Sequence, residues 1–481
     1  MGLEDSKLTQ LLKTFTPLEL KRLENFILSP FFNTSKQINT LFNILKKSYP
    51  EFDDIAKEKI FKAIYPNETY KDKKVRDLLS RLLKLTEAYL AHLEFSGMDM
   101  LQIRFAMQQL SRRNLEKHFT GKLKEAEQQL DKEKIVSADY FFNKYSILKE
   151  KRSYLEILTS LGKRTLFFND IIEETDLFVV YSIYKILKYG LTFQTHERIS
   201  RHKYDFKMLD EILLYLKANP INDYPVIMIQ YYTIILNRDE GDESMYFELR
   251  NLLKNNLDTL EEDDRRTIMV VLFNYTKTQA LKGNQMFRKE NYIILKDTIE
   301  KGLHPMEGNF FPESSYITVV GTALQEKDYQ WAENFMKSYK EQLPPEQREN
   351  AYNLCNSILN YRLGKYGVAL KGLARVSIDD FYYHLRVKNH QLKIYYEMGD
   401  YDSTERTIDS FRHFLSTTKF IPEYIKVRFV NYVNFVSRIV NARLSGHLHN
   451  LIDIKNEIVN FNQEHLENKT WLLEQINKVK I

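Results

Sequence analysis

Apolar residues along this chain recur three and four positions apart, which is the spacing of one face of an α-helix. Within the first hundred residues this spacing predicts helices over about 17–29, about 35–49, between Pro50 and Pro66, and from about 72 onward. The first of these helices has a defined start, because Thr16-Pro17-Leu18-Glu19 is a capping box with proline at the first helical position. The short turns between the helices predict a small helical domain over residues 1–98.

The middle of the chain carries longer helical patterns. A charged, Gln-rich stretch from about 101 to 130 predicts one long solvated helix, which would connect two bodies over residues 99–135. Aromatic-rich helices are predicted over about 140–161 and about 171–189. The segment 194–203 (QTHERISRHK) has no apolar stripe and predicts a loop. Beyond it, helices of about 12 to 20 residues alternate with short polar turns to residue 481.

A short pattern recurs at three of these turns. Its copies are Lys327-Asp328-Tyr329-x-x-Ala332, Gly364-Lys365-Tyr366-x-x-Ala369 and Gly399-Asp400-Tyr401-x-x-Thr404. They stand 37 and 35 residues apart, which is typical of a helix–turn–helix repeat of about 34 residues. Glycine ends one helix, the tyrosine ring lies between the two helices, and the small residue lets the second helix approach closely. We therefore expect these turn residues to be structural.

Composition agrees with an all-α fold. The 481 residues include only 15 Gly and 11 Pro, so few positions interrupt a helix. A hydrophobic fraction of 43%, with 31 Tyr and 30 Phe, excludes wholesale disorder. The net charge of +5 permits nucleic-acid contact without requiring it. A single cysteine, Cys355, excludes an intrachain disulfide and suits a reducing cytoplasm, where we expect the protein to be located.

The three turns resemble the tetratricopeptide repeat family over residues 310–418. The first copy departs from the family pattern with Lys327 in place of Gly, and the third with Thr404 in place of Ala. The resemblance implies a right-handed α-solenoid of antiparallel helix pairs over residues 136–481, whose concave face binds a partner, and it implies no enzymatic activity. The whole chain is also similar to bacterial helical-repeat proteins of uncharacterised function.

A second resemblance lies at residues 57–90, which are similar to the paired helices of winged-helix transcription regulators. That likeness implies contact with nucleic acid through Lys73, Lys74, Arg76, Arg81 and Lys84. Residues 71–84 hold six basic and two acidic side chains. No β-hairpin wing is expected, because the helical pattern continues after Tyr89. The alternative interpretation of these five residues is an ordinary solvated basic face.

No constellation of residues predicts catalysis, a metal or a cofactor. The pairs His196/His202 and His384/His390 are six residues apart, so on a helix their rings would point about 240° apart and could not share one ion. Gly162-Lys163-Arg164-Thr165 lacks the leading glycine and the strand of a phosphate loop. Cys355 lies on an apolar helical stripe and is expected to be a small buried hydrophobe rather than a nucleophile.

Two further segments are candidate contacts with a partner. The segment 196–204 is a basic cluster with Arg198, Arg201 and Lys203 that would suit an acidic or phosphorylated partner, or would be a solvated loop. In each of the pairs Tyr382-Tyr383 and Tyr395-Tyr396, one ring is expected in the core and the other accessible as an anchor. The sequence thus predicts a non-enzymatic protein-interaction scaffold. The alternative is a DNA- or RNA-binding regulator whose repeats act as a sensor or oligomerisation module.

Overall fold

The computed structural model describes residues 6–52, 55–163, 168–200, 202–238, 242–378 and 380–479. These residues are all-α: they contain no β-strand, and the one isolated antiparallel bridge joins Glu307 to Phe310. The chain divides into two compact units. Unit 1 is Met1–Gln230 with Asp258–Leu260, and unit 2 is Tyr231–Leu257 with Glu261–Ile481. Among the described helices, none combines the length and the apolar run needed to cross a bilayer.

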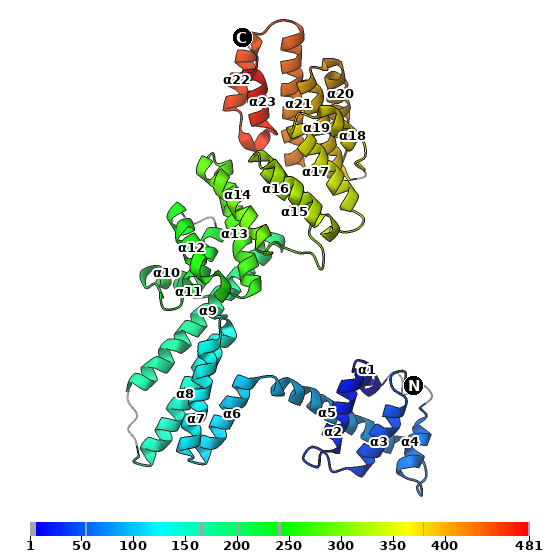
Figure 1. The fold of residues 1–481 in the computed structure, drawn as a ribbon, viewed down its shortest axis with the longest axis vertical. Coiled ribbons are helices and arrows are strands. Elements are labelled where there is room, and N and C mark those ends of the chain that lie inside the picture. Colours follow the sequence, from blue (N-terminus) through cyan, green and yellow to red (C-terminus); the bar gives the residue numbers. More distant parts are fainter. Residues whose placement is uncertain are drawn as a thin grey trace. The chain divides into compact units, whose positions relative to one another are not determined.

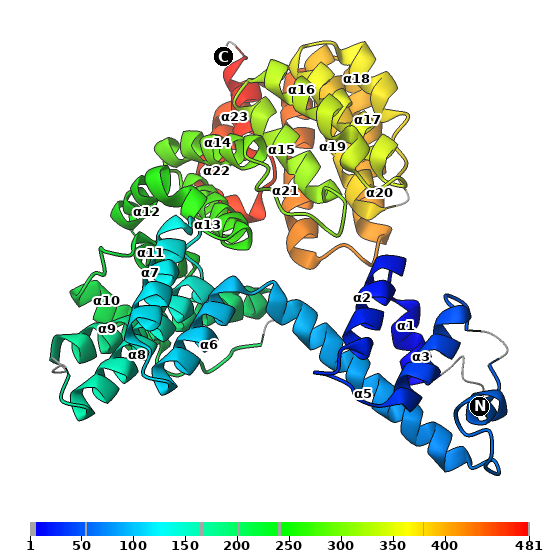
Figure 2. The same ribbon diagram turned by 60° about the horizontal axis from the view of Figure 1, so that its bottom comes forward.

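Unit 1 begins with α1 (Lys7–Lys13), α2 (Pro17–Leu28), α3 (Lys36–Lys47), α4 (Lys57–Ile64) and α5 (Asp72–Ser96). The predicted capping box is present: Oγ1 of Thr16 accepts from the Glu19 amide at 3.2 Å, and Oε2 of Glu19 accepts from the Thr16 amide at 2.7 Å. The first four helices all contact α5, and Figure 2 shows α1, α2 and α3 along one side of it. One apolar stripe of α5 fills their common core, and its outer face stays solvated.

The predicted single helix over residues 99–135 is wrong. The structure has two helices there, α6 (Asp99–Arg112) and α7 (Glu116–Lys132), which pack side by side. The chain reverses at Asn114, whose φ is +55°, and the Leu115 amide donates to the Leu110 carbonyl at 3.1 Å. Asparagine tolerates this left-handed conformation, so it closes the hairpin without glycine or proline. The predicted domain ranges 1–98 and 136–481 themselves stay predictions.

The loop predicted over 194–203 is also wrong for residues 194–200, which continue a long helix. Unit 1 continues with α8 (Ala138–Ser160), α9 (Phe168–Ser200), α10 (Leu209–Ala218) and the start of α11 (Pro225–Asn237). The helix extends past the apolar stripe because Gln194 is buried and the Phe193 ring packs on Tyr204 and Phe206, with centroids 5.2 and 5.0 Å away. Tertiary contacts thus replace the missing apolar periodicity.

Unit 2 is a succession of helices in which neighbours along the chain pack pairwise. They are α12 (Glu243–Asn256), α13 (Glu262–Leu281), α14 (Gln285–Glu300), α15 (Glu313–Gln325), α16 (Tyr329–Tyr339), α17 (Arg348–Arg362), α18 (Tyr366–Leu373), α19 (Phe381–Met398), α20 (Tyr401–Thr417), α21 (Glu423–Leu444), α22 (Asn450–Asn460) and α23 (Lys469–Asn477). Figure 1 shows α15 to α20 side by side. This arrangement is compatible with a helical-repeat protein.

The three recurring turns share one backbone geometry. Lys327, Gly364 and Gly399 have φ of +62°, +73° and +74°. In each turn the next amide donates to the carbonyl five residues back, at 3.1, 2.9 and 3.1 Å. These bonds satisfy carbonyls that the end of the first helix would otherwise leave unpaired. The small residues of the pattern, Ala332, Ala369 and Thr404, are fully buried, as close packing of the second helix requires.

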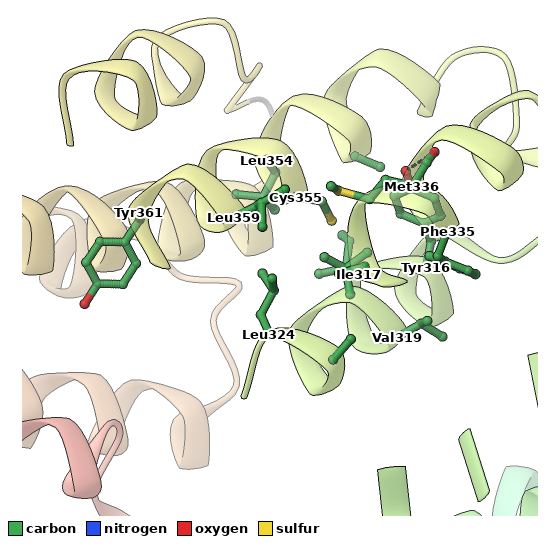
Figure 3. Close-up of a cluster of buried hydrophobic side chains, with 14 of the residues drawn as sticks. Tyr316, Ile317, Val319, Leu324, Phe335, Met336, Leu354, Cys355, Leu359 and Tyr361 are labelled. Atoms are coloured by element: carbon green, nitrogen blue, oxygen red, sulfur yellow. Dashed lines mark hydrogen bonds between the residues drawn. The ribbon is translucent and has the colours of Figure 1, made fainter. Parts of the chain in front are cut away.

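The core of the repeats is apolar and continuous from α14 to α19. Figure 3 shows Cys355 of α17 beside Leu354 and Leu359, facing Ile317 of α15. Cys355 is 0% exposed, which confirms that it is a buried side chain within an apolar stripe. Close packing continues at Gly372 of α18, where an added Cβ would stand 2.2 Å from Oγ of Ser357.

Candidate functional site

An aromatic hollow lies in unit 2 where α19 begins and α20 ends. Its volume is about 610 Å³, and the lining residues are Ile378, Asp380, Phe381, His384, Phe414, Thr418 and Phe420. Ile378 and Asp380 come from the loop before α19, and Phe420 comes from the loop after α20. Side chains from two helix ends and two loops therefore converge on this hollow, and most of them are apolar.

The rings of the hollow pack on one another. The imidazole of His384 stacks on Phe414 with centroids 3.8 Å apart, and Phe381 lies against Tyr382 at 4.0 Å. Burial, with the nearby Lys388 charge next, lowers the pKa of His384, so its ring is neutral near pH 7. The Phe420 side chain is 85% exposed. An exposed phenyl beside an uncharged aromatic wall is suited to receive an apolar side chain of a partner.

The local sequence explains why Tyr382 points outward. Asp380 caps α19, and its carboxylate accepts from the Tyr382 amide at 2.6 Å. The helix that starts there directs Tyr383 into the core, where it is 7% exposed, and leaves Tyr382 44% exposed. Tyr396 is likewise buried at 3%, and Tyr395 is half-buried. The prediction that one ring of each pair enters the core is confirmed, and the predicted accessible partner is exposed at Tyr382 but only half-buried at Tyr395.

A second cluster in unit 2 is polar and lies along α19. Both carboxylate oxygens of Glu397 accept hydrogen bonds from tyrosines of the preceding helix pair: Tyr361 at 2.6 Å and Tyr366 at 2.9 Å. The indole of Trp471 in α23 donates to the same carboxylate at 2.7 Å. Since α23 returns to α19 across 74 positions of sequence, the last helix covers this face rather than leaving it open.

Lys393 lies within this polar cluster. It is 7% exposed, and its ammonium donates to Oδ1 of Asn468 at 2.6 Å and stands 5.7 Å from the Trp471 ring. Burial, with the Arg362 charge next, lowers the pKa of Lys393 to about 8. Sequence reasoning missed Lys393 and Glu397, because the segment that covers them is distant in the sequence and no local pattern marks it.

The basic residues of α5 divide into two groups. Lys74 is paired with Glu68 at 2.5 Å and Arg76 with Asp72 at 2.8 Å. Lys73, Arg81 and Lys84 are exposed, and within the described residues they make no ion pair. No strand follows α5 in the described part of the chain, so the wing that would complete the resemblance is missing there.

The predicted cluster at 196–204 is described only in part. Arg201 and the side chain of Arg198 lie outside the described residues. Lys203 is exposed, and the Tyr204 amide donates to Oε1 of Glu197 at 2.7 Å. In the described residues, no three His, Cys, Asp or Glu side chains stand close enough together to hold a metal ion.

Comparison with protein-family models, curated proteins and solved structures finds no match to this chain. Evidence about its function therefore comes from its own residues. The surface best suited to bind a partner is the aromatic hollow, because its lining is mostly apolar, includes an exposed phenyl ring and comes from two helix ends and two loops.

Proposed function

We propose that this protein is a non-enzymatic interaction scaffold that binds a protein or peptide partner through the helical array of unit 2. The observation that carries the proposal is the aromatic hollow around Phe414 and Phe420. The pairwise helices and the turns at Lys327, Gly364 and Gly399 support a right-handed, tetratricopeptide-like array as the framework. The single thiol, Cys355, suits a location in a reducing cytoplasm.

The energetics favour a partner that inserts an apolar side chain. Burying one large apolar side chain contributes about 1.5–3 kcal/mol, and aromatic pairs add roughly 0.5–1.5 kcal/mol beyond area burial. Binding hot spots are enriched in aromatic residues that become fully desolvated. Phe420 is 85% exposed and Tyr382 is 44% exposed, so both rings can bury further apolar surface when a partner binds.

A peptide-display library tests the proposal. Peptides enriched on the wild-type chain should contain a shared aromatic or aliphatic anchor and should lose most of their affinity for the Phe414→Ala, Phe420→Ala variant. The matched control is Phe31→Ala in unit 1, because Phe31 is 87% exposed and Phe420 is 85% exposed. Equal enrichment on the double variant and the wild type would reject the hollow as the binding site.

A nucleic-acid-binding regulator is the second candidate function. It is favoured by one observation: Lys73, Arg81 and Lys84 share the solvated side of α5 and have no ion-pair partner among the described residues. Such cations can contact phosphates without first breaking an internal pair. Asp77 lies between them on the same exposed side and offsets part of their charge.

A further inference from the structure

An open groove runs along the outer face of the α6–α7 hairpin in unit 1. Its volume is about 730 Å³, and the lining residues are Ala106, Gln109, Leu110, Arg113, Lys117, His118, Gly121, Lys122 and Glu125. The groove exists because residues 99–135 form a hairpin, so that side chains from two helices line one surface. It lies outside the unit that carries the aromatic hollow.

The hairpin uses its other face for packing. Its buried residues include Ile103 and Met107 of α6 and Phe119 and Ala126 of α7, which pack with Tyr154 and other residues of α8. Of the groove residues only Leu110 also packs against that core, and it is partly buried there. Gly121 is one of the lining residues, and it leaves space beside α7, since a Cβ built there would meet no atom within 4 Å.

The groove combines an apolar floor with a positive rim. We call its apolar lining residues Ala106, Leu110 and Gly121 the floor, and its charged lining residues Arg113, Lys117, Lys122 and Glu125 the rim. Lys122 is paired with Glu125 at 2.7 Å. Arg113 donates only to neutral oxygens of Gln109, at 2.6 and 2.9 Å. Lys117 is exposed and makes no ion pair within the described residues, so the rim keeps a net positive charge.

We propose that this groove binds an acidic amphipathic helix of a partner protein. A third helix that lies between two antiparallel helices places apolar residues at i, i+3, i+4 and i+7 against the floor. Carboxylates that flank this stripe then face Arg113 and Lys117, which is the charge complementarity of the rim. A nucleic acid fits less well, because its phosphates would meet an apolar floor and the Glu125 carboxylate.

With the α6–α7 groove in unit 1 and the aromatic hollow in unit 2, the proposed scaffold has one recognition surface in each unit. The groove stands on the residues of α6 and α7 alone, so it does not depend on the aromatic hollow. The Phe414→Ala, Phe420→Ala variant should therefore bind a groove ligand as the wild type does, which separates the failure of one proposal from the failure of the other.

The direct test is fluorescence anisotropy with a labelled 18-residue synthetic peptide that carries leucine at helical spacing and glutamate on both flanks. A peptide of the same composition with the leucines dispersed is the comparator. Binding should require the helical spacing and should weaken as salt rises, because the rim charges are exposed. Lys117→Glu with Lys122→Glu should weaken binding by roughly tenfold or more, whereas Lys132→Glu, an exposed α7 lysine outside the groove, should leave it unchanged.

Gly121→Leu provides a variant that keeps the fold. Leucine favours helix over glycine and fills the floor of the groove, so this variant should bind the peptide at least about tenfold more weakly while melting no earlier than the wild type. The proposal would be overturned if the dispersed peptide bound equally well, or if the Lys117→Glu, Lys122→Glu variant bound the peptide as the wild type does. It would also be overturned if a duplex DNA of about 20 base pairs bound more tightly than the peptide through the same lysines.

Discussion

The hydroxyl of Tyr361 donates a 2.6 Å hydrogen bond to Oε1 of Glu397, across 36 positions of sequence. This bond joins α17 to α19, and Tyr366 and Trp471 use the same carboxylate. Burial, with the Glu397 charge next, raises the pKa of Tyr361. One carboxylate therefore links two successive helix pairs and the last helix of the chain.

Glu397→Gln should destabilise unit 2 by about 1.5–3 kcal/mol, the range for hydrogen bonds to a charged group. The neutral amide weakens three charge-assisted bonds and presents an N–H₂ group to donors. Urea unfolding followed by tyrosine and tryptophan fluorescence measures the effect. Glu405→Gln, an exposed position on α20, is the control and should stay within about 0.5 kcal/mol of the wild type. Equal stabilities of the two variants would contradict this role of Glu397.

At the recurring turns, replacing glycine and replacing lysine should change the stability in opposite directions. Gly364→Ala should cost about 1 kcal/mol or more, because alanine disfavours a φ of +73° and the surrounding space is otherwise open. Lys327→Gly should stabilise by about 1 kcal/mol at the equivalent turn, where φ is +62°. Thermal melting of both variants checks the signs.

The control for these turns is Gly321→Ala. Gly321 lies inside α15 with open space around its Cβ position, so alanine should stabilise by up to about 1 kcal/mol. If Gly364→Ala also raised the melting temperature, the left-handed geometry of that turn would be wrong.

The stability of the protein should rise with pH above about 8 through Lys393. The pKa of this lysine is about 8 in the folded chain and 10.5 when solvated. Between these values the unfolded chain binds more protons than the folded chain, so raising the pH favours folding, by at most about 3–4 kcal/mol. Below pH 8 Lys393 is protonated in both the folded and the unfolded chain, so the free-energy cost of burying its charge is present in full.

Denaturant unfolding of the wild type and Lys393→Met between pH 7 and 10 measures this contribution. The variant should lack the rise, and the difference between the two proteins cancels the contributions of other titrating groups. Lys371→Met, an exposed position on α18, should follow the wild type. A constant difference across the pH range would show that Lys393 does not titrate as described.

Cys355 should be inert until unit 2 unfolds. Burial raises the pKa of its thiol, and the side chain has no exposed surface, so neither thiolate nor access is available. A thiol-reactive dye should label the native protein negligibly and label it stoichiometrically in guanidinium. Rapid labelling of the native chain would contradict the packing of α17 against α15.

The basic face of α5 gives a test of the nucleic-acid alternative. If that function holds, Lys73→Ala with Arg81→Ala and Lys84→Ala should lower the slope of log affinity against log salt by about 2 to 3. Replacing the paired residues Lys74 and Arg76 should lower it less, because their charges are already offset by Glu68 and Asp72. If neither duplex DNA nor single-stranded RNA binds with any salt slope, the regulator hypothesis is wrong.

Local patterns in the sequence were sufficient to predict most of the helices and the caps named below. The capping box at Thr16, the apolar stripe of α5 and the turns at Gly364 and Gly399 all depend on residues within one or two helical turns of each other. The burial of Cys355 follows from the same periodicity. These features were predictable because helix formation and capping are short-range.

The tertiary structure alone decided the rest. The hairpin at Asn114 and the extension of α9 to Ser200 contradict the local pattern, because packing of distant residues outweighs weak local preferences. Glu397 accepts from Trp471 of α23, and the buried Lys393 donates to Asn468 at the start of that helix, each more than seventy positions away. The aromatic hollow and the α6–α7 groove likewise exist only where separate elements meet, so the all-α class was determined by the sequence pattern and the recognition surfaces by the three-dimensional packing.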